Sequence, residues 1–110
     1  MAAPKDLIPS DYLRAVSPDV AEPFFRMRDA AKNLGPLDQT TYELILLTGL
    51  AILNHEEVFK VHATRARSLG IPKQALQHAM LVMLGSTLTI QGVTRSLRWI
   101  DTIYDTAPTE

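Results

Sequence analysis

The sequence predicts an all-α fold: a single-domain helical bundle over residues 1–110, built around a central antiparallel helix hairpin. Three observations lead to this prediction. Apolar residues recur at intervals of three and four, the period of a helix, rather than in strict alternation. Glycine and proline turn signals cut the chain into pieces of helical length. Asn54 is a turn candidate between two such pieces, and so short a connection predicts that the two helices run antiparallel.

The first long helix is predicted at about residues 20–34. Ser17 can cap its start and Pro18 suits the first helical position, whereas Pro23 leaves open a start a few residues later. A Gly-Pro pair at residues 35–36 ends it. The apolar stripe of this helix consists of Val20, Phe24, Met27, Ala31 and Leu34.

The second helix is apolar nearly all round over residues 42–53. Such a helix is typically central, packed on several sides by neighbouring helices or by another subunit. Asp38 is its expected N-cap, and Leu37 can pack on Tyr42 as a hydrophobic staple. The third helix is predicted at about residues 55–69.

Further turn residues mark the remaining elements. Gly70 should end the third helix in a left-handed conformation with Ile71 covering the end, and Pro72 opens the fourth helix, which runs to Gly85.

Two helical segments rest on weaker signals. Apolar spacing predicts a last helix over residues 90–104, although threonines and Gly92 disfavour a helix near its beginning. A short helical turn is expected over residues 10–16. Residues 106–110 should fray.

Composition excludes several classes of function. The 110-residue chain carries a formal net charge of −1, which gives no electrostatic case for nucleic acid or an anionic membrane as a partner. It has no cysteine, which excludes disulfides, zinc–thiolate sites, thiolate nucleophiles and cysteine-based peroxidase chemistry. The apolar stretch at residues 44–53 is about half of the ~20 residues that a membrane span needs. Residues 1–9 lack the apolar segment of a secretory signal, so we expect a cytoplasmic protein.

Glu43 and His62 are the candidate catalytic residues, because a carboxylate and an imidazole among leucines and valines are costly to bury without a partner. In a hairpin about Asn54, Glu43 lies eleven residues before the turn and His62 eight after it. Their heights then differ by ~4–5 Å, which a glutamate side chain can bridge. A carboxylate that accepts from one imidazole nitrogen makes the other a better base, as general acid–base catalysis requires.

Each of these residues also has a purely structural interpretation. Glu43 can be a solvated residue near the start of its helix, stabilised by the helix dipole. His62 can be a satisfied core histidine. Only their joint spacing favours a site.

Other polar residues near the pair are weaker candidates. His55 is expected to be exposed or to cap its helix, and Glu57 is a rival acid that can instead be solvated and paired with Lys60. We predict no metal site, since His55 and His62 are ~10 Å apart along one helix, too far to share an ion. Arg95 and Trp99 share one side of the last helix and can line a pocket or a subunit interface.

Three segments carry a resemblance to a known family: residues 37–45 opening the central helix, residues 56–67 around the histidine, and residues 70–72 before the next helix. Over residues 37 to about 103 the chain resembles the carboxymuconolactone decarboxylase family, which includes an alkyl hydroperoxidase D-like branch.

The two branches of that family differ at the site. In the redox branch a glutamate precedes a Cys-x-x-Cys pair and a histidine; aligned without gaps, these fall on Glu43, on His55 and Val58, and on His62. This chain therefore keeps the glutamate and the histidine of the redox branch but has neither of its two cysteines. The decarboxylase branch has no cysteine pair and carries an acidic stretch similar to residues 56–57, so it is the nearer match.

The resemblance implies an alkyl hydroperoxidase D-like helical fold, assembly into trimers or hexamers, and a pocket near the hairpin and subunit contacts. It implies a small-molecule substrate and no cofactor, because a conjugated lactone can take up the electrons that decarboxylation leaves behind. His62 would donate or accept the proton and Glu43 would orient it. Arg65 would pair with a substrate carboxylate, with Glu57 and His55 as further substrate-binding candidates.

The sequence departs from the family at one turn, where residues 85–90 replace a Gly-x-Pro-Ala-Ala-Asn-like motif, and this change should reshape one wall of the pocket. The reaction can therefore be a decarboxylation or a related isomerisation, hydration or ring closure. A second interpretation also stands: a non-catalytic oligomeric binding or assembly module in which Glu43 and His62 only satisfy each other.

Overall fold

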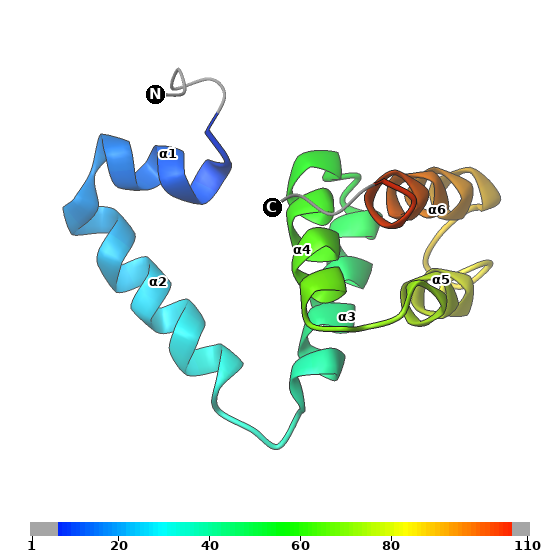
Figure 1. Cartoon of the computed structure of the whole chain (residues 1–110), viewed down its shortest axis with the longest axis horizontal. Helices are drawn as coiled ribbons and strands as arrows, with labels where there is room; N and C mark the ends of the chain where they lie inside the picture. The colour runs from blue at the N-terminus through cyan, green and yellow to red at the C-terminus, as the bar shows by residue number, and fades with distance from the viewer. Residues whose placement is uncertain (1–6, 107–110) are drawn as a thin grey trace. The chain divides into compact units, whose positions relative to one another are not determined.

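The computed structural model describes residues 7–106, and it is all-helical in that range (Figure 1). The described residues contain no β-strand, only an isolated bridge between Leu84 and Leu88. The predicted all-α class is confirmed. The helices are α1 (Pro9–Val16), α2 (Pro18–Lys32), α3 (Gln39–Ile52), α4 (Glu56–Ser68), α5 (Lys73–Val82) and α6 (Ile90–Tyr104).

The chain divides into two compact units, residues 1–39 with α1 and α2 and residues 40–110 with the bodies of α3 to α6. In the first unit, the Ser17 hydroxyl accepts a hydrogen bond from the Val20 N–H at 3.3 Å and caps α2, as predicted. Pro18 takes the first helical position. The expectation that Pro23 delays the start is wrong, because α2 continues through Pro23 and forgoes the one hydrogen bond that its missing N–H would make.

The second unit has the predicted central hairpin, in which α3 and α4 run antiparallel (Figure 1). Asn54 forms the turn with a φ of 58°, a left-handed conformation that asparagine tolerates better than most residues. The His55 N–H donates to the Leu50 carbonyl at 2.9 Å and closes the end of α3. Gly70 ends α4 in the same way, with a φ of 82°, and Ile71 covers the end at 4% exposure.

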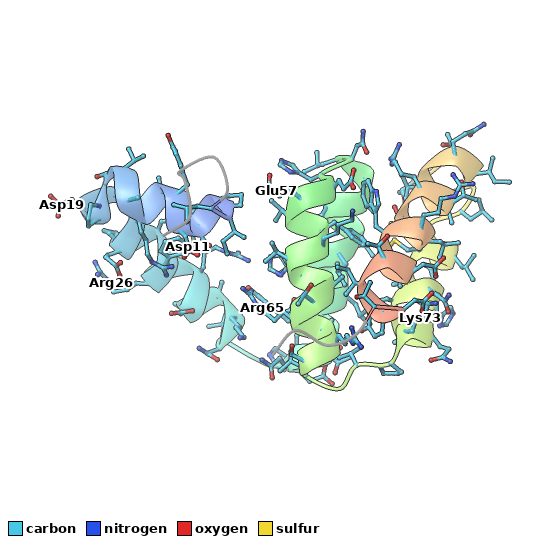
Figure 2. All side chains as sticks on the ribbon, turned by 45° about the horizontal axis from the view of Figure 1, so that its top comes forward. Asp11, Asp19, Arg26, Glu57, Arg65 and Lys73 are labelled. Carbon is cyan, nitrogen blue, oxygen red and sulfur yellow. The ribbon has the colours of Figure 1, made fainter. Side chains whose placement is uncertain are left out.

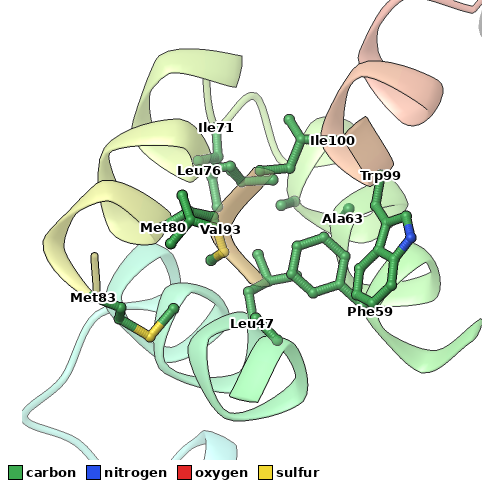
Figure 3. Close-up of a cluster of buried hydrophobic side chains, with 12 residues drawn as sticks. Leu47, Phe59, Ala63, Ile71, Leu76, Met80, Met83, Val93, Trp99 and Ile100 are labelled. Carbon is green, nitrogen blue, oxygen red and sulfur yellow. The ribbon is translucent and has the colours of Figure 1, made fainter. Parts of the chain in front are cut away.

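The hydrophobic core of this unit is shared by α3 to α6 (Figure 3). Phe59 of α4 is fully buried, and its ring centroid lies 5.2 Å from that of Trp99 on α6. Further buried members of the core are Leu47, Ala51, Ala63, Ala66, Leu76, Met80, Met83, Val93 and Ile100.

The connection between α5 and α6 differs from the prediction. α5 ends at Val82 rather than at Gly85, because the Met83 carbonyl accepts hydrogen bonds from the N–H groups of Ser86, Thr87 and Leu88 and closes a tight loop. α6 begins at Ile90 as predicted, capped by Thr89. A Cβ at Gly92 would lie 2.9 Å from a terminal methyl of Leu88, so a larger residue here would force that side chain to move. The predicted fraying of residues 106–110 falls mostly on residues 107–110, outside the described range.

Four polar contacts fasten the carboxyl end of α6 to the α4–α5 region. An Arg67 nitrogen donates to the Ile103 carbonyl at 2.7 Å, and the Tyr104 hydroxyl donates to the Ile71 carbonyl at 2.7 Å. Lys73 pairs with Asp101 at 2.9 Å and Asp105 at 2.8 Å. Burial raises the pKa of Tyr104, and Arg67 opposes this to a smaller extent.

We predict that Tyr104→Phe lowers the free energy of unfolding by about 1 kcal/mol at neutral pH through loss of the hydroxyl hydrogen bond. Because the pKa of Tyr104 is higher in the folded than in the unfolded chain, the stabilisation it gives is present below pH ~10 and is lost as the pH rises through the folded pKa. The difference in stability between the two proteins should therefore shrink above pH ~10. Urea unfolding across this range measures it, and a difference that does not change with pH would contradict the assignment.

Candidate functional site

Glu43 and His62 meet across the α3–α4 hairpin. His62 Nδ1 lies 3.1 Å from Glu43 Oε2, within hydrogen-bonding distance. A carboxylate only accepts hydrogen bonds, so with Glu43 ionised this contact requires the His62 tautomer whose proton is on Nδ1. The contact that the spacing predicted is therefore present.

Local packing explains how each side chain reaches this position. Glu43 lies one turn before Leu47 on the inward face of α3, so its side chain is directed toward the core. His62 lies three residues after Phe59 and next to Ala63, both fully buried on the inward face of α4. The imidazole occupies the edge of that face.

The two side chains differ in exposure. The Glu43 side chain is fully buried, whereas the His62 side chain keeps 15% of its surface exposed. The solvated interpretation of Glu43 is therefore wrong, because its position on α3 places it among core residues. Glu43 Oε1 is buried and has no hydrogen-bond partner. Such a carboxylate interacts more strongly with the imidazole than it would in water.

This arrangement supports proton transfer. With Nδ1 held by Glu43, Nε2 is the nitrogen left to exchange a proton with a substrate at the exposed edge. The buried carboxylate also stabilises the imidazolium that forms when Nε2 takes up a proton. The pair can act as a general base and then as a general acid.

The other candidates lie on the outside of α4. Arg65 and Glu57 are exposed and project away from the helix (Figure 2). His55 precedes the first turn of α4, is exposed, and makes no side-chain capping bond. Lys60 pairs with Glu56 at 2.7 Å, one turn apart on α4, rather than with Glu57 as expected. The structure thus brings Glu43 and His62 together and leaves these three residues on the surface.

The sequence places Arg95 and Trp99 on one side of the last helix and assigns them no single role. In the structure the Arg95 guanidinium carbon lies 5.5 Å from the centroid of the Trp99 ring, a cation–π contact. The spacing of four residues between an arginine and a tryptophan on one helix is the sequence signal that could have predicted this contact. The burial of Arg95 Nε could not be derived from that spacing.

Other features of the described residues give limits on the site. A surface hollow of about 340 Å³, lined by residues between Lys32 and Gln39, includes neither member of the pair. Within residues 7–106, no group of three or more histidine, aspartate or glutamate side chains is placed to hold a metal ion. In the same range, no helix is long and apolar enough to cross a membrane.

Comparison with known proteins identifies one family. The model of the carboxymuconolactone decarboxylase family matches residues 18–100 of the 110, from the start of α2 into α6. No curated protein and no solved structure gives a significant match.

Proposed function

The chain belongs to the carboxymuconolactone decarboxylase family, and on that premise we propose that it is a cofactor-independent acid–base enzyme acting on a small carboxylic acid or lactone. The reaction is a decarboxylation, or a related isomerisation or hydration that uses the same proton transfers. The observation that supports this most directly is a partly exposed imidazole hydrogen-bonded to a fully buried carboxylate.

In a decarboxylation, the bond between the substrate and its carboxylate breaks, and the electron pair moves into the conjugated lactone as an enolate. Carbon dioxide leaves. His62, as an imidazolium stabilised by Glu43, then delivers the Nε2 proton to the carbanionic carbon and becomes neutral. A proton from water restores the imidazolium. No electron acceptor is needed, because the substrate itself delocalises the charge.

The proposal assigns roles to the surface residues on α4 as well. Arg65, one turn beyond His62, would pair with a substrate carboxylate through its planar guanidinium. Glu57 and His55 would contact substrate at the amino end of α4. Their exposure leaves all three accessible to a small molecule. Peroxidase chemistry of the cysteine-dependent kind is not part of the proposal, since the sequence has no cysteine.

We also propose that the protein works in the cytoplasm as a homo-oligomer, a trimer or hexamer. Large apolar side chains uncovered in the single chain support assembly, among them Phe24 at 45%, Leu53 at 70% and Val82 at 66% exposure. Sedimentation of the purified protein measures the state of assembly.

The direct test is turnover. Purified protein, treated with a metal chelator, is incubated with carboxymuconolactone and with a panel of unsaturated acids and lactones, while carbon dioxide release and ultraviolet absorbance are followed. The proposal predicts catalysed loss of at least one substrate. If none is converted, while native mass spectrometry of the purified protein shows a retained small molecule, the alternative of a non-catalytic binding module is favoured.

A further inference from the structure

Arg95 is a cation with an unusual environment in the described part of the chain. Its Nε is buried and has no hydrogen-bond partner. None of the ion pairs formed by the described residues involves Arg95, whereas Arg14 pairs with Asp11 and Arg67 donates to a carbonyl. Its guanidinium group instead lies against the indole ring of Trp99.

A partly buried arginine without an anion is energetically unfavourable. The guanidinium group has five N–H donors and no acceptor, and an arginine cannot relieve the cost of burial by losing its proton. The cation–π contact with Trp99 compensates in part, but it satisfies no N–H donor. An anion that accepts hydrogen bonds from the guanidinium group would satisfy these N–H donors.

The local geometry favours an anion at this position. The Arg95 side chain folds back toward the start of α6, so that its Nη2 is 3.6 Å from the position a Cβ would occupy on Gly92. The amino end of a helix carries positive partial charge and disfavours a cation there. An anion beside Arg95 would be attracted by both the guanidinium group and the helix.

The ring contacts connect this cation to the candidate site. The centroid of the Trp99 ring lies 5.5 Å from the Arg95 guanidinium carbon and 5.2 Å from the centroid of the Phe59 ring, which Figure 3 shows beside it. Phe59 is one helical turn from His62 on α4. Arg95 on α6 and His62 on α4 are thus each close to one member of the Phe59–Trp99 ring pair.

We propose that Arg95, beside Trp99, forms a binding site for the carboxylate of a small, flat unsaturated acid, the carboxylate accepting from the guanidinium group and the conjugated part lying next to the small exposed part of the indole, whose residue is 7% exposed. This inference rests on the proposed function for the identity of the ligand as substrate. It assigns to Arg95 a carboxylate-binding role separate from that of the exposed Arg65.

The experiment uses Trp99 as a reporter, because it is the only tryptophan of the sequence. Muconate, a flat unsaturated dicarboxylate, is titrated into the full chain while tryptophan fluorescence is recorded, with its dimethyl ester and inorganic phosphate as comparison ligands. A saturable change with muconate, absent with the ester and at least about tenfold weaker with phosphate, is expected.

Variants locate the ligand. Arg95→Gln should weaken muconate binding about 10- to 100-fold, and Arg95→Lys should restore part of it. Arg98→Gln is the matched control, since it removes the same charge from the exposed side of α6 and should bind as the parent does. Circular dichroism verifies that each variant is folded.

Three results would overturn the proposal: no saturable change with muconate, equal binding by Arg95→Gln, or equal affinity for phosphate. If the anion is instead a carboxylate of a second copy of the chain, fluorescence will depend on protein concentration without ligand and muconate will have no effect. Binding without turnover would leave this inference standing and contradict only the proposed enzymatic function.

Discussion

Replacing His62 by glutamine should lower kcat on any substrate of the protein by about 10²- to 10⁴-fold, the usual contribution of a general acid–base group. Glutamine is the informative replacement, because its amide can still donate a hydrogen bond to the buried Glu43 carboxylate but cannot exchange a proton with a substrate. The fold should therefore be retained. Steady-state kinetics combined with thermal unfolding measures both effects.

His78→Gln on α5 is the matched control, since His78 is exposed and is not a member of the Glu43–His62 pair. Its turnover should equal that of the parent. His62→Ala should in addition destabilise the fold by about 1–3 kcal/mol, because it leaves the Glu43 carboxylate buried without a partner. Turnover unchanged in His62→Gln would show that the imidazole does no chemistry.

Phe59→Ala should lower the free energy of unfolding by about 3–5 kcal/mol, the range for removing a fully buried aromatic ring from a core. Phe59 contacts Trp99 of α6 from α4, so its loss leaves a cavity where the two helices meet. Such a loss is a large part of the total stability of a small protein. Chemical unfolding followed by circular dichroism gives the value.

The conservative variant Phe59→Leu tests whether the loss comes from the cavity. Leucine keeps much of the apolar volume, so this variant should lower the free energy of unfolding clearly less than Phe59→Ala does. A loss below about 1 kcal/mol for Phe59→Ala would mean that the α4–α6 contact does not hold the bundle together.

Much of the fold followed from local sequence signals. Ser17, Asn54 and Gly70 each ended or began a helix where expected, because caps and left-handed turns depend on a few neighbouring residues. The end of α5 was misplaced because its loop is closed by three N–H groups on one carbonyl, a backbone arrangement that side-chain identities do not encode. The tolerance of α2 for Pro23 was equally hidden from the residue pattern.

The site was predictable to the extent that it depends on helix geometry. Heights along an antiparallel hairpin placed Glu43 beside His62, and the 3.1 Å contact confirms that step. The pattern could not show that Glu43 is sealed while His62 stays open, because exposure depends on how α4 meets other helices. Which of Glu56 and Glu57 binds Lys60 depends likewise on rotamers, and the expected pairing of Lys60 with Glu57 was wrong.

The most direct test of the account is the tautomer of His62 in the parent protein, read from long-range ¹H–¹⁵N correlations at alkaline pH, where imidazoles are neutral. The account predicts a proton on Nδ1, held by the Glu43 carboxylate, and an unprotonated Nε2 at the exposed edge. It also predicts that Glu43→Leu, which removes the acceptor, loses this preference. A proton on Nε2 in the parent, or the same spectrum in both proteins, would contradict the coupling on which the proposed chemistry rests.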